Sequence, residues 1–281
     1  MAEKMFKHFI IVRFFSFEDP KYPYDIYDPE FLSKQLVLAK NNALSSLNNQ
    51  TKKDFELVFR VNEKFFSDPK YEFIFTELQN ETTVPVKFIK NAEQTRLIKE
   101  ATTEYDFVIT SRMDFDDFIY KDAVSDIQNK ISECEDILVY GYCSGYTYIW
   151  EELYPDYNLC DGIGHLAILQ SVILKSSSAK KFHFISAYSF DHAKFKRKMK
   201  ELLEKCGVEF SESMFQQNTS TIAYIYFRHE FSHYNLVNKS KMRIPNYPRK
   251  LSERRPLTTA DITKEELAAE FGFHYDLKSI K

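Results

Sequence analysis

The first 117 residues alternate between short apolar runs and amphipathic runs. The apolar runs are rich in β-branched and aromatic residues and predict strands. These strands are expected at 9–15, 55–62, 86–89 and 105–109. Between them, apolar residues recur every three or four positions, which predicts helices. These helices are expected at 28–49, 67–78 and 92–103. Such alternation of strand and helix favours a mainly parallel sheet covered by helices.

The second half of the chain is less regular. Further strands are expected at 136–140, 147–150, 166–169 with a possible extension through 172–174, and 221–227. The first three lack clear intervening helices, so this half is expected to be mixed or antiparallel. Helices are expected at 119–131 and 190–207. The predicted fold class is therefore α/β, with a mixed sheet that has a parallel N-terminal half flanked by helices and a partly antiparallel C-terminal half.

Composition narrows the class of protein. The chain has 281 residues and a formal net charge of -3, which suits one large domain with a short appendage and argues against wholesale nucleic-acid binding. Its four cysteines form no C-x-x-C pair, so we expect them to be reduced, in a cytoplasmic protein. No stretch approaches the roughly 20 apolar residues of a membrane span, and the N-terminus lacks the pattern of a signal peptide.

An acidic run follows the strand expected at 105–109. It contains Asp114, Asp116 and Asp117, and carboxylates this close repel one another unless a cation lies between them. Mg²⁺ and Mn²⁺ prefer oxygen ligands and commonly share them with a substrate phosphate, and ligands of open α/β sheets bind at the carboxyl ends of strands. The run therefore favours a metal–diphosphate site. The alternative is a solvated loop in which Asp116 and Asp117 cap the next helix.

Several motifs together resemble a known class of enzyme. They are Ser46-Leu-Asn-Asn-Gln-Thr51 before Phe55-Glu-Leu-Val58, the helix expected after Asn91, and the Asp-x-Asp-Asp run. This combination is similar to glycosyltransferases of the GT-A fold. More narrowly, three segments resemble a family of rhamnosyltransferases over residues 8–235. They are Val12-Arg13-Phe14, Thr110-x-Arg-x-Asp-x-Asp-Asp117 and Tyr226-Phe-Arg-His-Glu230.

The resemblance implies a sugar transferred from a nucleoside diphosphate donor, UDP or dTDP, with Mn²⁺ or Mg²⁺ bound. It implies that Asp114 contacts the ribose or the metal, that Asp116 is the main metal ligand, and that Asp117 is a neighbouring metal or sugar contact. His229 is a further candidate metal ligand, with an ordinary surface or core histidine as the alternative.

The resemblance also suggests other site residues. Arg13, Arg96 and Arg112 are candidates for nucleotide or phosphate contacts, although Arg13 could instead pair with an acid. Asn62 follows the second strand, where such enzymes often contact the base. In an inverting enzyme Asp191 would take the proton of the acceptor hydroxyl, or it would simply cap the following helix, and Asp161 is the other candidate base.

The C-terminal part carries a distinct composition. We expect a catalytic domain over 1–235, with a nucleotide-binding half up to 117 and an acceptor half from 118, and a basic extension over 236–281. Residues 239–255 are a candidate lid, a candidate contact with an anionic membrane, or a solvated face. A capping box of Thr263 and Glu266 predicts a short helix through Phe271. The expected acceptor is a glycan or glycolipid.

Other functions fit the sheet less well. A nucleotidyltransferase would carry a glycine-rich loop after the first strand, but Ser16-Phe-Glu-Asp-Pro20 has no glycine. An aspartyl-phosphate phosphohydrolase would place its Asp-x-Asp after the first strand rather than the fourth. A non-catalytic glycan-binding protein stays open as an alternative, although it would not need three carboxylates at a strand end.

Overall fold

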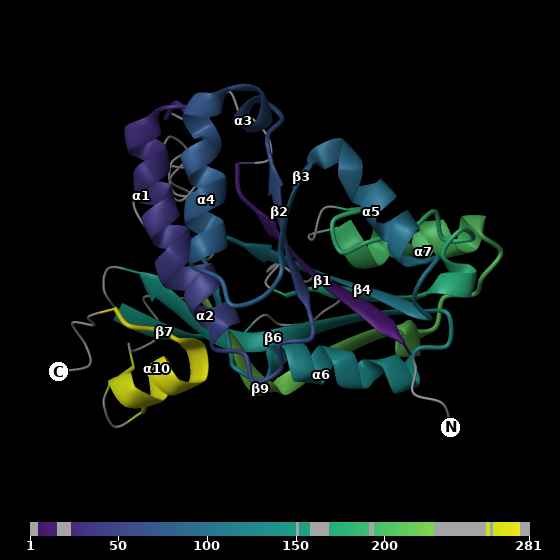
Figure 1. Cartoon of the computed structure of the whole chain (residues 1–281). Coiled ribbons are helices and arrows are strands. Elements are labelled where there is room, and N and C mark those ends of the chain that lie inside the picture. The colour runs from purple at the N-terminus through teal and green to yellow at the C-terminus, as the bar shows by residue number, and fades with distance from the viewer. Residues whose placement is uncertain are drawn as a thin grey trace.

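The computed structural model describes residues 5–15, 24–149, 152–157, 169–190, 194–227, 257–258 and 261–275. Its centre is a nine-stranded sheet in the order β3-β2-β1-β4-β8-β6-β9-β5, with β7 paired to β6. The strands are β1 Phe6–Arg13, β2 Glu56–Val61, β3 Val86–Lys90, β4 Phe107–Asp114, β5 Phe118–Ile119, β6 Ile137–Ile149, β7 Glu152–Tyr157, β8 Ser171–Lys175 and β9 Phe215–Phe227. Helices lie on both faces of this sheet (Figure 1).

The two halves of the sheet differ in strand direction. β1 pairs in parallel with β2 and β4, and β2 pairs in parallel with β3. Beyond β4 the sheet is mixed, because β8 runs antiparallel to both β4 and β6 while β9 runs parallel to β6. The predicted fold class, a mixed α/β sheet with a parallel N-terminal half, is confirmed.

The helices agree broadly with the periodicity of the sequence. They are α1 Pro29–Ala39, α2 Ser45–Asn48, α3 Lys64–Ser67, α4 Glu72–Asn80, α5 Gln94–Ala101, α6 Ala123–Asn129, α7 Phe195–Lys205 and α10 Lys264–Phe271. Asp28 caps α1 through the N–H of Glu30, and a π-helical segment, Lys40–Leu44, joins α1 to α2. The capping box of Thr263 and Glu266 starts α10 as expected.

Some predicted elements are wrong in detail. Asn91 does not cap a helix: a 3₁₀ turn, Asn91–Glu93, begins there, and Glu93 closes it back onto the N–H of Lys90. Ile119 is not helical, because Phe118 and Ile119 pair with β9 as a short strand, so α6 begins four residues later than expected. The strands expected at 136–140 and 147–150 are parts of one strand, β6, whose described residues end at Ile149.

The sheet separates two apolar layers, because successive side chains of a strand point to opposite faces. On one face Ile10 and Val12 of β1 join the largest core cluster, to which helices α1, α2, α4, α6 and α10 contribute side chains. On the other face Phe9 and Ile11 pack with Val58, Val108 and helix α5. A third cluster joins β6 and β8 to α7.

Two smaller findings bear on the expectations from composition. Among the described residues, no helix combines the length and the apolar character that a membrane span needs. Cys134 and Cys206 are free, but Cys143 is disulfide-bonded. The prediction of four reduced cysteines is therefore wrong at Cys143, and the cytoplasmic assignment loses that support.

A buried polar network crosses the sheet at His8. Its Nε2 lies 2.8 Å from Ser111 Oγ, which lies 2.6 Å from Ser171 Oγ, and Ser171 donates to the carbonyl of Leu169 at 3.0 Å. Gln128 Nε2 lies 3.3 Å from His8 Nδ1. If Gln128 donates to Nδ1, the proton of a neutral imidazole sits on Nε2 and every bond of the chain has one donor and one acceptor. Burial lowers the pKa of His8 from 6.5 to about 3.

This network predicts an acid-sensitive fold. The unfolded state takes up a proton at His8 between pH 6.5 and about 3 while the folded state does not, so stability falls as pH falls through that window. From pH 7 to pH 5 the loss from His8 is about 2 kcal/mol. Urea unfolding at both pH values should show a smaller loss in His8→Gln than in the wild-type protein, and equal losses would contradict the assignment.

Candidate functional site

A row of charged side chains lies where three parallel strands end. In the register of the sheet, Arg13 of β1 sits beside Arg60 of β2 and Asp114 of β4. Since carboxyl ends of parallel strands meet at one edge of a sheet, these residues lie at the edge where ligands of α/β proteins bind. All three follow apolar residues on the α5 face, in the patterns Ile11-x-Arg13, Val58-x-Arg60 and Val108-x-Thr-x-Arg-x-Asp114.

An ion pair joins the ends of β1 and β4. Arg13 Nη2 lies 3.0 Å from Asp114 Oδ2, with side chains 31% and 25% exposed. The negative charge of Asp114 is the main reason that the pKa of Arg13 is raised above its usual range, and Asp116 adds to the effect. Of the two expectations for Arg13, pairing with an acid is therefore what the structure shows.

Asp117 lies inside the protein. It is 1% exposed, and its Oδ1 accepts a hydrogen bond from the backbone N–H of Phe227 at 3.2 Å. This bond fixes the end of β9 against the acidic run. The geometry favours a structural role for this carboxylate over direct metal ligation.

Asp116 is half-buried and is held through its backbone. Asn42 Nδ2 donates to the carbonyl of Asp116 at 2.7 Å, and the hydroxyl of Tyr275 donates to Asn42 Oδ1 at 2.6 Å. Asn42 belongs to the π-helical segment and Tyr275 follows α10, so distant parts of the chain set the position of Asp116.

The acidic run can be tested as a cation site. No group of three or more His, Cys, Asp or Glu side chains among the described residues is arranged to hold a metal ion. Mg²⁺, however, is usually held by one or two carboxylates together with substrate phosphates and water. Two half-buried carboxylates, those of Asp114 and Asp116, suit such a shared site in number and type, but they do not make an all-protein cage.

Tyr188 stands over the same edge of the sheet. Its ring centroid lies 4.3 Å from the guanidinium carbon of Arg60 and 4.5 Å from that of Arg112. Its hydroxyl donates to the carbonyl of Met113 at 2.9 Å. Burial raises the pKa of Tyr188, so the hydroxyl stays protonated. Neither Tyr188 nor Arg60 is among the site residues predicted from the sequence.

Two predicted contact residues have partners close to them in the sequence. Arg96 is on α5 with its side chain 67% exposed, and it pairs with Glu93 at 2.9 Å and with Glu100 at 3.7 Å. Asn62 follows β2, and its Oδ1 accepts from the N–H of Lys64 at 3.0 Å, which starts the α3 turn. The structure thus brings Arg13, Arg112 and Asp114 together but not Arg96.

Other predicted residues lie outside the described part of the chain. They are Asp161, Asp191 and His229, together with the whole basic segment 239–255. Two of them follow closely, in the sequence, residues that contact the end of β4 or the acidic run. Asp191 comes three residues after Tyr188, and His229 comes two residues after Phe227, which is bonded to Asp117. Their predicted roles stay predictions.

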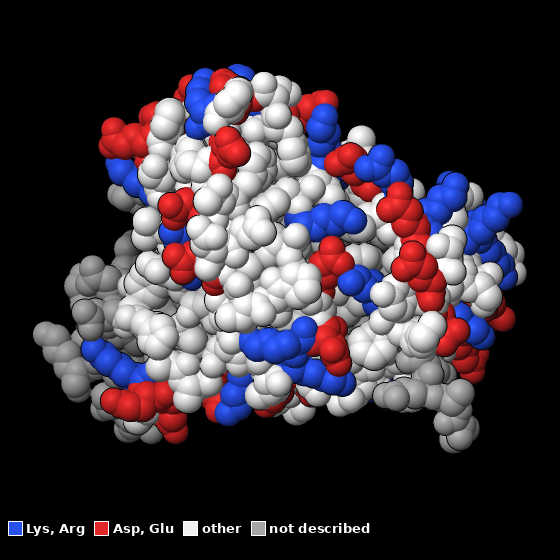
Figure 2. Space-filling view, in the orientation of Figure 1, with Lys and Arg blue, Asp and Glu red and all other residues white. Residues whose placement is uncertain are grey.

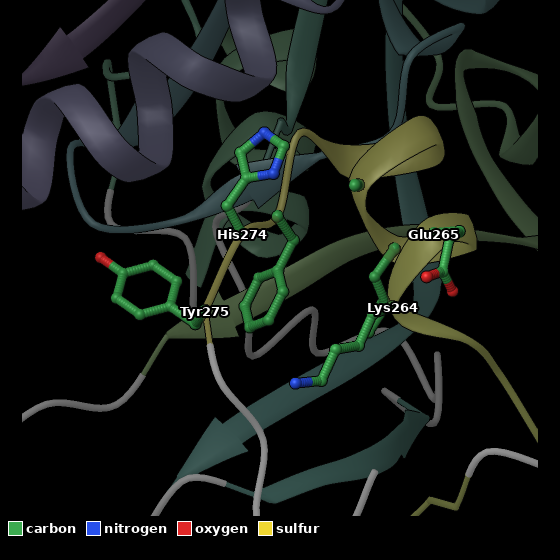
Figure 3. A pocket seen from close by; sticks show the side chains of 7 residues that line it. Lys264, Glu265, His274 and Tyr275 are labelled. Atoms are coloured by element: carbon green, nitrogen blue, oxygen red, sulfur yellow. The ribbon is translucent and has the colours of Figure 1, made fainter. Parts of the chain in front are cut away.

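A pocket of about 250 Å³ has no residue of the acidic run in its lining. Its lining comes from α10 and the segment after it, with Lys264, Glu265, His274 and Tyr275 labelled in Figure 3. Tyr275 connects this pocket to Asp116 through Asn42. Lys and Arg are interspersed with Asp and Glu over the face drawn in Figure 2, so this face carries no broad basic patch of the kind that binds nucleic acid.

Comparison with known proteins identifies the family. A family model described as "Putative rhamnosyl transferase" matches residues 23–225, which span α1 to β9, and the chain belongs to this family of glycosyltransferases. No curated protein matches the chain.

Solved structures show only distant likeness. S. aureus TarS 1–349 in complex with UDP is 16% identical, with a TM-score of 0.43, over 79% of this chain and 60% of that one. A glucose-1-phosphate thymidylyltransferase from Bacillus anthracis, described as putative and in complex with a sucrose, is 8% identical, with a TM-score of 0.40, over 78% of this chain and 88% of that one. In another structure of S. aureus TarS the match covers 37% of that chain, so this chain spans less than two thirds of the TarS structures it matches. These scores are too low to bear on function.

Asp116 and Asp117 are expected to contribute differently to the stability of the protein. Asp117→Ala removes the acceptor of a buried hydrogen bond and should destabilise the protein by about 1–3 kcal/mol. Asp116→Ala, at a half-buried side chain, should change stability much less. Urea unfolding at pH 7 measures both, and equal stabilities of the two variants would contradict the structural role of Asp117.

Proposed function

We propose that this protein transfers a sugar, with rhamnose as the candidate, from a nucleoside diphosphate donor to a hydroxyl of a glycan or glycolipid. UDP and dTDP are the candidate nucleotides, and Mn²⁺ or Mg²⁺ is the candidate cation. One observation carries the proposal. In a chain of this family, the Arg13–Asp114 pair fixes the acidic run at the carboxyl edge of the parallel strands, with Asp116 beside it.

The residues of this edge have separable roles. Asp116 would be the main ligand of the cation, with Asp114 as a ribose or metal contact, and the bound cation would stabilise charge on the diphosphate as a Lewis acid. Arg13 holds Asp114 in place and limits the repulsion between the carboxylates. Asp117 has a structural role, because it accepts the hydrogen bond from Phe227 at the end of β9. His229, which follows that strand end, stays the candidate for a further ligand.

Transfer also needs a proton acceptor. As the bond from the sugar to the diphosphate breaks, its electrons stay on the diphosphate, and the acceptor oxygen bonds to the anomeric carbon as it loses its proton. In an inverting reaction a carboxylate takes that proton. Asp191 is the preferred candidate, because the segment Ser186–Tyr188 that leads to it is fixed at the edge of the sheet. Ala187 N–H donates to Thr110 Oγ1 at 3.0 Å, and Tyr188 bonds to Met113. Asp161 is the other candidate.

The setting of the reaction is also part of the proposal. The expected acceptor, a glycan or glycolipid, suits a protein that works at the cytoplasmic face of a membrane. The basic segment 239–255 is the candidate for contact with anionic lipid. The nucleotide-binding half up to 117 and the acceptor half from 118 are proposed to meet at the acidic run.

A nucleotide screen tests the function. Thermal unfolding should shift upward with one of UDP, dTDP, GDP or CMP, and the shift should grow with Mn²⁺, because only the folded state binds. With the matching nucleotide sugar, Asp116→Ala should lose transfer by at least 100-fold, since it removes charge stabilisation worth several kcal/mol. Glu204→Gln, an exposed change on α7, is the matched control. Full activity in Asp116→Ala would defeat the assignment.

A further inference from the structure

Arg112 is a buried cation with little to balance it. The residue is 4% exposed, and its Nε has no hydrogen-bond partner among the described residues. No ion pair of Arg112 occurs in the described part of the chain either. Removing a guanidinium from water without an anion costs several kcal/mol. A protein keeps such a group at a strand end when something else supplies the anion.

Tyr188 offsets only part of this cost. Its ring contacts both Arg112 and Arg60, and a cation–π contact contributes about 1–2 kcal/mol when it is shielded from water. The tyrosine is itself held by its bond to Met113. It therefore acts as a spacer that fixes two positive groups at a set separation, although their charges repel.

Arg60 is oriented from the opposite side. Its Nη1 donates to Gln94 Oε1 at 3.0 Å, and Gln94 Nε2 donates to Ser186 Oγ at 2.7 Å. Burial lowers the pKa of Arg60, and the charges of Arg13 and Arg112 lower it further. Three guanidiniums thus act on one another at the ends of β1, β2 and β4, where the described carboxylates are Asp114 and Asp116. Of these three, Arg112 is the buried guanidinium whose Nε has no hydrogen-bond partner among the described residues.

We propose that Arg60, Tyr188 and Arg112 form a preformed site for the diphosphate of the donor, and that this site binds the diphosphate without a divalent cation. The inference rests on the proposed function for the identity of the anion. Arginine suits the task because its planar guanidinium donates two hydrogen bonds to a phosphate. Tyr188 is a positioning residue, which holds the two guanidiniums but leaves the phosphate contacts to them.

Isothermal titration with inorganic pyrophosphate in EDTA tests this site directly. The wild-type protein should bind pyrophosphate, and Arg112→Gln and Arg60→Gln should each weaken binding at least 10-fold. Tyr188→Phe keeps the ring but loses the bond to Met113, so it should weaken binding less than Tyr188→Leu, which loses both. Arg197→Gln on α7, whose side chain is 66% exposed, is the matched control and should bind as wild type. Absence of binding in EDTA, or full binding by Arg112→Gln, overturns the proposal.

Thermal unfolding separates an anion site from a purely structural cluster. If the site awaits an anion, Arg112→Gln without ligand should be as stable as wild type or more so, and pyrophosphate should stabilise only the wild type. If the arginines serve the fold alone, Arg112→Gln should be less stable and pyrophosphate should act on both proteins equally, which overturns the proposal. Because pyrophosphate carries no sugar or base, these results stand apart from the nucleotide screen. If pyrophosphate binds but no nucleotide raises the unfolding temperature, the proposed function is contradicted while the anion site stands.

Discussion

The ion pair between Arg13 and Asp114 is the interaction on which the rest of the site depends. It joins the ends of two neighbouring parallel strands, so the sheet itself sets its geometry. Each partner would be costly to keep at this half-buried edge without the other. The pair holds Asp114 at the start of the acidic run. After it the chain places Asp116 at a half-buried position and Asp117 inside the protein.

Much of the fold could be predicted from the sequence, because each strand and helix of the N-terminal half carries its own local pattern. The run from Phe9 to Phe15 is apolar throughout, and Asp28-Pro29 is a strong helix start. The errors lie where pairing overrides local preference. Ile119 fits a helical spacing, but β9, about a hundred residues later, takes it into the sheet. The local pattern of roughly ten to fifteen residues around Ile119 carries no signal of a strand that pairs with it from so far along the chain.

The site could be predicted only in part, for a related reason. Arg13 is recognisable in the sequence because it is a charged residue within an apolar run. Arg112 and the acidic run are recognisable because they follow one. Arg60 stands in the same pattern as Arg13, after Val58 on the same face, and this signal could have identified it. Tyr188 could not be identified in this way, because its partners are distant in the sequence: Arg60 lies 128 residues earlier and Arg112 lies 76 residues earlier. Nothing in the residues around Tyr188 indicates that two arginines meet there.

Strand β6 has a mechanical consequence. It pairs with β7, β8 and β9, and through β8 it is continuous with β4 and the parallel N-terminal half of the sheet (Figure 1). The two halves therefore share one hydrogen-bonded framework and cannot swing apart like the jaws of a hinge without breaking it. In the proposed reaction, a bulky acceptor would therefore enter by movement of segments outside the sheet, while the paired strands beneath the acidic run keep their spacing.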